Sequence, residues 1–148
     1  MHTTHGIILK KTDAGETDAL YTIYTKDFGK IRALAKGIKK EDAKLKGHLE
    51  AVSLSMISFV EGKSGFRLTH ASLMEPWRGI RNDLRKLDLA VRIAGLIDAE
   101  CFEMERDDGL WKLCTDTFQE IERTETTESI NKFTAQLKEA LGYGRENV

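Results

Sequence analysis

The side chains with the clearest chemical potential in this chain are the lysines and arginines between Gly29 and Gly47. This stretch of nineteen residues holds seven basic and two acidic side chains, a net charge of +5, in a chain whose net charge is −1. Such a local excess of one sign marks an electrostatic surface, and ammonium and guanidinium groups bind phosphates. The stretch therefore predicts a polyanion as the partner. The residues predicted to contact its phosphates are Arg32, Lys36, Lys39, Lys40, Lys44 and Lys46.

The charge is also distributed unevenly along the chain. Residues 1–97 hold 17 basic and 11 acidic side chains, whereas residues 98–148 hold 6 and 13. The first part is suited to attracting a phosphate backbone, and the second would repel the same strand and suits protein contacts or solubility. A helix surface that is merely rich in glutamate is a second interpretation of the acidic part, and it stays open.

Motifs for catalysis and metal binding are not evident in the sequence. It has no phosphate-cradling GxxxxGK(S/T), no GxSxG, no HExxH and no GxGxxG after a strand. Its two cysteines, Cys101 and Cys114, stand among apolar neighbours in helical patterns, where a thiol behaves as a small hydrophobic group. The four histidines have no ligand spacing, and His70 has no partner in sequence that could orient it as a base. We therefore expect a binding protein without metal or cofactor rather than an enzyme.

The elements that must position the cations begin with a β-rich region that ends near Pro76. Five short runs rich in β-branched and aromatic residues are predicted to be strands, at 6–11, 19–25, 30–36, 51–60 and 66–74. Turn residues separate the runs, and the glycines at 62 and 65 have the spacing of a hairpin turn. Five strands with a basic connection after the third fit a small closed barrel, because closure removes exposed edges. A five-stranded Greek-key barrel is favoured, although an SH3-like barrel has the same periodicity.

Alternation in the third strand predicts which cations face outward. Arg32 and Lys36 share one face with Leu34 between them, while Ile31 and the alanines at 33 and 35 share the other. The lysines that follow this strand therefore extend a cationic face that begins on the strand itself.

Aromatic residues could offer a stacking platform for unpaired bases. Tyr21 and Tyr24 occupy opposite faces of the second predicted strand, so at most one of them is expected outside. Phe28, Phe59 and Phe66 are expected in the core or in turn packing. The cationic track is therefore better supported than any stacking platform.

After Trp77 the apolar period changes to that of a helix. A first helix capped by Asn82 or Asp83 is predicted, with one buried stripe formed by Leu84, Leu87, Val91, Ala94, Ile97, Cys101 and Met104. A second helix is predicted over about 108–123, and a third between a Thr127 cap and a Gly142 stop. The predicted fold class is α+β, a five-stranded β-barrel domain over 1–76 followed by an α-helical bundle domain over 77–148.

Length and composition are those of a globular protein. With 148 residues, 41% hydrophobic residues and one proline, the chain can bury a core, and disorder is not expected. No apolar run approaches the roughly 20 residues of a membrane helix. The N-terminal residues have too few apolar positions, and lysines on the wrong side, for a secretory signal. A cytoplasmic location without membrane association is expected.

The order of three motifs resembles that of the RecO family, the bacterial DNA repair proteins that mediate recombination. The motifs span Gly29 to Lys40, Leu45 to Glu50 and Leu68 to Pro76. The resemblance implies an OB-fold that binds nucleic acid, followed by a helical domain. It also implies a non-catalytic protein that binds single- and double-stranded DNA, anneals complementary strands, and loads RecA together with RecR and single-stranded DNA-binding protein. The family's basic loop corresponds here to Lys36, Lys39, Lys40, Lys44 and Lys46.

One departure from the family pattern concerns the end of the chain. The LGY motif at 141–143 is commonly followed in the family by a four-cysteine zinc module or its remnant, whereas this chain ends at Val148. We therefore expect a short or truncated member of the family without zinc. The resemblance also implies association with the nucleoid. Two alternatives stay open: a scaffold whose basic loop docks the acidic tail of a partner protein, and a barrel that binds RNA.

Overall fold

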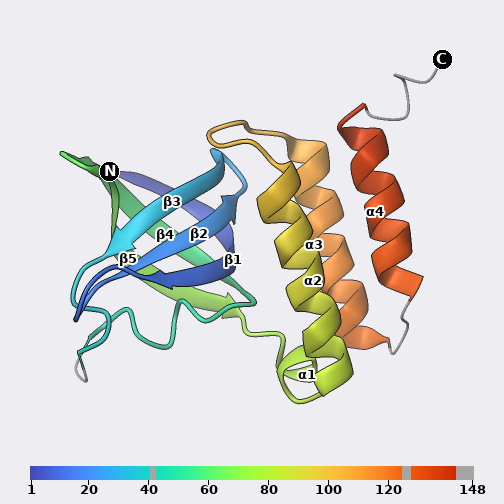
Figure 1. Cartoon of the computed structure of the whole chain (residues 1–148), viewed down its shortest axis with the longest axis horizontal. Coiled ribbons are helices and arrows are strands. Elements are labelled where there is room, and N and C mark those ends of the chain that lie inside the picture. Colours follow the sequence, from blue (N-terminus) through green and yellow to red (C-terminus); the bar gives the residue numbers. More distant parts are fainter. Residues whose placement is uncertain (41–42, 125–127, 143–148) are drawn as a thin grey trace.

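The computed structural model describes residues 1–40, 43–124 and 128–142. Within these ranges the chain forms five strands and then four helices, and α4 is the helix farthest from the strands (Figure 1). The strands are β1 His2–Asp13, β2 Ala19–Thr25, β3 Gly29–Ala35, β4 Ser53–Gly62 and β5 Gly65–Glu75. The helices are α1 Arg78–Arg81, α2 Leu84–Glu100, α3 Asp108–Arg123 and α4 Glu128–Ala140.

The strands close into a barrel in the order β1–β2–β3–β5–β4, with β4 paired back to β1. Neighbouring strands are antiparallel except β3 and β5, which run parallel and close the seam. This order is the five-stranded Greek-key arrangement of an OB-fold. The predicted α+β class and Greek-key barrel are therefore confirmed, and the SH3-like alternative is set aside.

Most strand boundaries follow from the apolar alternation. β2 spans the predicted residues, and β3, β4 and β5 begin and end within two residues of theirs. β1 is longer than predicted at both ends, from His2 to Asp13. Gly62 and Gly65 pair across the β4–β5 hairpin, as predicted. The φ of +114° at Gly65 is a backbone conformation that residues with a Cβ rarely adopt, so glycine suits this turn.

Two apolar clusters hold the fold together. The first fills the barrel and includes Ile8 and Ile23. The second lies between the barrel and the helices, where Ile7 from the outer face of β1 joins buried side chains of α2, α3 and α4. Tyr21 belongs to the first cluster and Tyr24 to the second, so the two rings do point to opposite faces, and both are buried. Neither tyrosine is available for base stacking.

The predicted phase of the first long helix is partly wrong. The side chains that α2 buries are Ala90, Ile93, Ala94 and Ile97, whereas Leu84 and Val91 are 85% and 55% exposed. Both exposed positions lie more than a quarter turn from the centre of the buried face. Met104, expected on the same stripe, is beyond the end of the helix and has φ +58°. The buried face is the one that packs against the barrel and the neighbouring helices, and Leu87, Leu89 and Leu96 are partly buried against the same cluster.

The helix ends are set largely by local capping. The carboxylate of Asp83 accepts hydrogen bonds from the backbone N–H groups of the first turn of α2, which confirms it as the cap. α3 spans the predicted residues, and Gly142, at φ +84°, follows the end of α4 as predicted. The predicted cap Thr127 lies outside the described residues. α1 was not predicted, because four residues are too few to show a helical period. Among the described helices, none is long and apolar enough to cross a bilayer.

A buried lysine and one aspartate join α2 to the barrel. Lys30 of β3 is buried, and its Nζ donates to the backbone oxygen of Asp98 at 2.6 Å and lies 3.5 Å from Oδ1. The second oxygen of Asp98 is 3.1 Å from Nζ of Lys10 on β1. Burial alone would raise the pKa of Asp98, but the hydrogen bond and charge of Lys10, with the charge of Lys30, outweigh it and hold that pKa below its usual value. Lys30 therefore contributes to packing and not to the cationic surface.

Replacement of Asp98 by asparagine is expected to lower the free energy of unfolding at neutral pH by about 1.5–3 kcal/mol, because two ammonium groups lose their anionic partner. Because the pKa of Asp98 is lower in the folded than in the unfolded protein, its carboxylate stabilises the folded state at pH values above the unfolded pKa. This contribution is lost as the pH falls through the folded pKa. The difference between wild type and Asp98→Asn should therefore begin to shrink below about pH 4 and disappear only once the pH is below the folded pKa of Asp98. Urea unfolding at several pH values measures it. Asp88→Asn, which removes an exposed pair with Arg92, is the matched control and should cost less than about 0.5 kcal/mol.

Candidate nucleic-acid interface

The outer face of β3 and the residue that follows the strand carry two of the predicted contacts. Arg32 and Lys36 are exposed, Leu34 between them is half-buried, and the intervening alanines point into the barrel, as the alternation predicts. Nε of Arg32 lies 3.3 Å from Oε1 of Glu103, in the connection between α2 and α3, and both side chains are about half exposed. An ion pair this exposed contributes about 0–1 kcal/mol, so the guanidinium can exchange partners.

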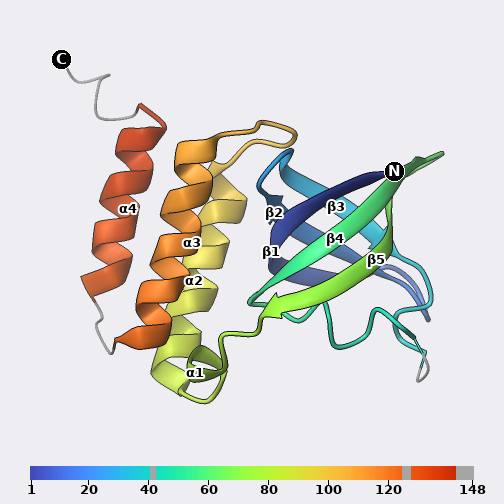
Figure 2. The same ribbon diagram turned by 180° about the vertical axis from the view of Figure 1, so that it is seen from behind.

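The connection between β3 and β4, of which residues 36–40 and 43–52 are described, is fixed to the end of the barrel near both of its ends. Ile38 and Leu49 are buried in the barrel core. Near the start of the connection, the backbone N–H of Gly37 donates to Oδ1 of Asp18 at 2.8 Å. This bond, followed by those of Thr17 and the charges of nearby lysines, lowers the pKa of Asp18. The connection is thus held along the end of the barrel, and Figures 1 and 2 show it well away from α4.

The six predicted contacts fall into two groups. Arg32 is paired with Glu103, and Nζ of Lys39 lies 2.9 Å from Oδ1 of Asp13 and donates to the carbonyl of Gly15 at 2.8 Å. The hydrogen bond from Lys39 and then its charge lower the pKa of Asp13. The other four are exposed and make no ion pair with a residue in the described ranges: Lys36, Lys40, Lys44 and Lys46.

A groove runs beside β3 where the barrel seam closes. β3 and β5 pair over two residues of each strand, Ala33–Phe66 and Leu34–Arg67. Two neighbouring hollows of about 510 and 560 Å³ share Leu34, Ser64, Gly65 and Phe66, and we call the two together the seam groove. Its lining residues are Leu20, Lys30, Ile31, Arg32, Leu34, Lys36, Gly62, Lys63, Ser64, Gly65, Phe66, Arg67, Glu103 and Met104.

Two cations of the seam groove were missed by the sequence analysis. Lys63 stands in the β4–β5 hairpin turn and Arg67 near the start of β5, and both are exposed. They line the same hollow as Lys36, although they are about thirty residues away from it in sequence. The sequence signal for these two cations was the predicted hairpin turn, which carries Lys63 and precedes Arg67. The position of this turn beside β3 follows from barrel closure, which is a non-local pairing.

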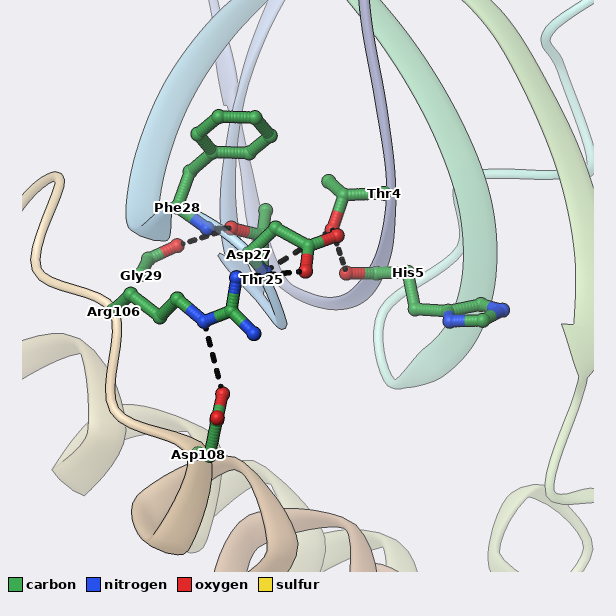
Figure 3. Close-up of polar contacts among 8 residues, drawn as sticks. All are labelled: Thr4, His5, Thr25, Asp27, Phe28, Gly29, Arg106 and Asp108. Atoms are coloured by element: carbon green, nitrogen blue, oxygen red, sulfur yellow. Dashed lines mark hydrogen bonds and ion pairs between the residues drawn. The ribbon is translucent and has the colours of Figure 1, made fainter.

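The connection between α2 and α3 is anchored to the β2–β3 turn, and this anchoring places Glu103 at the groove. The backbone N–H of Met104 donates to the carbonyl of Lys30 at 2.9 Å. Figure 3 shows Arg106 between two carboxylates, with its Nε 3.0 Å from Oδ1 of Asp108 and its Nη1 3.5 Å from Oδ1 of Asp27. Asp27 also accepts a hydrogen bond from the Thr4 hydroxyl at 2.8 Å. The position of Glu103 is therefore fixed by the fold.

Close packing reinforces this anchoring at Gly29. Gly29 has φ +67°, and a Cβ built there would lie 2.3 Å from the carbonyl oxygen of Glu105. Because the backbones approach so closely, any side chain at this position would push the α2–α3 connection away from the barrel.

The remaining candidates for chemistry are structural. Cys101 and Cys114 are buried free thiols, and burial raises the pKa of Cys101 to about 11 and that of Cys114 well above its usual value. His70 is exposed on β5. In the described part of the chain, no three histidine, cysteine, aspartate or glutamate side chains gather as metal ligands would.

Comparison with known proteins gives consistent matches. The family described as Recombination protein O N terminal matches residues 1–77. A protein of Dehalococcoides mccartyi is 31% identical over 144 residues, which cover 97% of this chain and 57% of that protein. A protein of Acetivibrio thermocellus is 27% identical over 95% of this chain and 57% of its own length, and one of Gloeothece citriformis is 30% identical over 88% and 46%.

All three of these relatives are named DNA repair protein RecO. The chain spans about half the length of the curated relatives that it matches. The family match covers the whole barrel, and the relatives extend the similarity through the helices. With its OB-fold barrel followed by helices, this chain belongs to the family of recombination protein O.

Proposed function

We propose that this protein acts in DNA repair as a non-catalytic mediator that binds DNA through the basic surface at the end of its barrel. The observation that carries the proposal is the set of four exposed lysines without an ion pair in the described ranges, Lys36, Lys40, Lys44 and Lys46. They extend from β3 along the β3–β4 connection, on a fold that commonly binds oligonucleotides. The names of the relatives support the repair role.

Phosphates are the proposed contacts because flexible, exposed ammonium groups neutralise a backbone without reading base edges. Binding should therefore show slight sequence preference and accept single- and double-stranded DNA. In this proposal Arg32 and Lys39 make secondary contacts with the DNA, since each already has a carboxylate partner. We propose residues 1–76 as the DNA-binding domain and residues 77–148 as the helical domain.

Strand annealing and recombinase loading belong to the same proposal. Neutralised phosphates let two complementary strands approach, so a surface that binds both strands promotes annealing. By the family resemblance, the protein would work with RecR and single-stranded DNA-binding protein to load RecA, at the nucleoid. Annealing kinetics of labelled complementary oligonucleotides, with and without these partners, would measure each activity separately.

Affinity for a single-stranded oligonucleotide is expected to fall steeply with salt. Four phosphate contacts at about −0.7 each give a slope near −3 for log affinity against log salt. Fluorescence anisotropy between about 50 and 200 mM salt measures this slope. Affinity that barely changes over this range would contradict phosphate binding by the lysines.

A second candidate is a scaffold whose basic surface docks the acidic tail of a partner protein. It is favoured by the carboxylates already bound there, Glu103 on Arg32 and Asp13 on Lys39. An acidic peptide titrated against labelled DNA separates the two functions. Competition indicates one shared surface, whereas peptide binding by a protein that does not bind DNA favours the scaffold. RNA in place of DNA as competitor tests the third alternative.

A further inference from the structure

His48 follows the lysines of the β3–β4 connection and is hydrogen-bonded through both its backbone and its ring. Its backbone N–H donates to the carbonyl of Leu45 at 3.1 Å and closes a turn that carries Lys46. Its carbonyl accepts from the hydroxyl of Ser55 on β4 at 2.6 Å. Its ring nitrogen Nδ1 accepts from the backbone N–H of Leu73 on β5 at 3.1 Å. One half-buried residue therefore joins the lysine-bearing part of the connection to two strands of the barrel.

The bond to Leu73 lies where the pairing of β5 is irregular. Ser55 pairs with Leu73, but the residue before it on β4 pairs with Glu75, so Met74 is the extra residue of a bulge. The pairs between β5 and β3 lie at the other end of β5. At this bulge the ring of His48 accepts the N–H of Leu73, and it thereby fixes the connection to β5.

The ring of His48 can accept this bond in only one protonation state. Nδ1 is an acceptor when the imidazole is neutral and carries its proton on Nε2. In the protonated ring both nitrogens are donors, so Nδ1 would meet the N–H of Leu73 with a hydrogen of its own. Histidine changes its charge between about pH 5 and 8. The bond is therefore present at the upper end of this range and is lost as the pH falls.

The other groups around His48 leave this dependence to its own ring. Its side-chain partner is a backbone N–H, which does not titrate here, and residues 53–60 of β4 include no charged side chain. Burial, with the charge of Glu50, raises the pKa of Tyr21 in the barrel core, so that phenol stays neutral over the range. The charged or titratable groups of the adjoining elements are Lys46 and Glu50 on the connection, His70 and Glu75 on β5, and Arg81 of α1, which pairs with Glu50. Of these side-chain types only histidine ordinarily titrates between pH 5 and 8.

Two turns before His48 carry the lysines that this residue would position. The backbone N–H of Lys46 donates to the carbonyl of Ala43 at 3.2 Å and closes a turn that includes Lys44. The turn closed by His48 follows directly. At the start of the connection, the backbone N–H of Lys39 donates to the carbonyl of Thr17 at 3.0 Å. Lys44 and Lys46 thus lie between one attachment to the β1–β2 loop and another at His48.

We propose that His48 is a positioning residue for the DNA-binding surface: its neutral ring holds the turns of Lys44 and Lys46 against the barrel, and protonation of the ring releases them. This inference rests on the proposed DNA-binding function and adds a residue that acts through the lysines. Lysines held in place can meet several phosphates at once. On a released segment they must first be ordered by the DNA, which lowers the affinity.

The first test is made at about pH 8, where a histidine ring is neutral. His48→Leu removes the acceptor, whereas His48→Asn offers an amide oxygen in its place. His48→Leu is expected to lower affinity for a labelled single strand about two- to fivefold, and to speed trypsin cleavage after Lys44 and Lys46 about two- to tenfold. His48→Asn should restore both to near the wild-type values. His70→Asn, which changes an exposed histidine of β5, is the matched control and should alter neither.

The second test follows the wild-type protein by NMR between about pH 8 and 5.5. The ¹⁵N shifts of His48 should show the tautomer with its proton on Nε2 at the higher pH. The protection factor of the Leu73 amide against hydrogen exchange should fall as the ring becomes protonated. In His48→Asn the protection should persist to the lower pH, because the amide oxygen does not titrate there. His70→Asn should behave as the wild type does.

Three results would overturn the inference. They are a failure of His48→Asn to restore the properties lost in His48→Leu, a Leu73 protection that falls equally in the wild type and in His48→Asn, and a His48→Leu variant that binds DNA as the wild type does. A wild-type protein that binds no DNA would refute the proposed function. The trypsin and exchange measurements would then still decide whether His48 holds the connection.

Discussion

Reversal of the four exposed lysines to glutamate, at positions 36, 40, 44 and 46, is expected to reduce DNA affinity at least about a hundredfold near 100 mM salt. The change replaces four attractive contacts with four repulsive ones, at lysines that make no ion pair in the described ranges, although the charge of Asp18 lies near Lys36 and Lys40. Anisotropy titration of a labelled single strand measures it. Lys39 is left unchanged, because reversal would set a carboxylate against Asp13 and disturb the connection itself.

The control for this prediction reverses the same amount of charge elsewhere. Its four cations lie on the helices, are exposed, and make no ion pair in the described ranges: Arg78, Arg85, Arg123 and Lys138. If net charge alone governed affinity, both variants would lose binding equally. A loss confined to the lysine variant would locate the contacts at the end of the barrel, and an unaffected lysine variant would remove the basis of the proposed function.

Trp77→Ala is expected to have the largest effect on stability, a loss of about 3–5 kcal/mol in the free energy of unfolding. Trp77 is 1% exposed, its ring stacks on Phe118 at 5.1 Å between centroids, and its Nε1 donates to Oε1 of Gln119 at 3.1 Å. Truncation leaves a cavity and an amide oxygen without its donor. Because small domains have only about 5–15 kcal/mol of stability, the variant would be close to unfolding.

Urea unfolding followed by circular dichroism measures this loss. Trp77→Phe keeps a ring against Phe118 and should cost less than Trp77→Ala, which separates the packing from the hydrogen bond. Phe102→Ala removes an aromatic side chain that is 66% exposed and should cost no more than about 0.5 kcal/mol. A Trp77→Ala variant as stable as Phe102→Ala would show that the junction between barrel and helices is not a principal source of stability.

The sequence was most informative where structure depends on neighbours along the chain. Alternation located the strands and the outward face of β3, because a strand with one buried side has a period of two. α3 was placed correctly because its apolar residues face one direction, from Leu110 to Ile121. α2 was harder, since it meets the barrel and the three other helices at once.

In the candidate site, too, some residues could be predicted from the local sequence and others could not. The lysines at 36, 40, 44 and 46 follow directly from the charge run, but the involvement of Arg32 and Lys39 with carboxylates does not. Glu103 lies about seventy residues beyond Arg32, and Asp13 comes from the β1–β2 region. Lys63 and Arg67 reach the groove through the parallel pairing of β3 and β5. The positions of Lys63 and Arg67 depend on barrel closure and that of Glu103 on the packing of the α2–α3 connection against the barrel, and no local pattern encodes either.

The apolar cluster between the barrel and the helices has a consequence for the geometry of any bound polymer. Ile7 and Tyr24 on the outside of the barrel are covered by α2 and α3, so that part of the circumference is closed to ligands. A strand lying on the barrel would follow an open arc and could not encircle it. Held on one side only, it would keep its opposite edge turned to solvent, where a complementary strand could approach and pair.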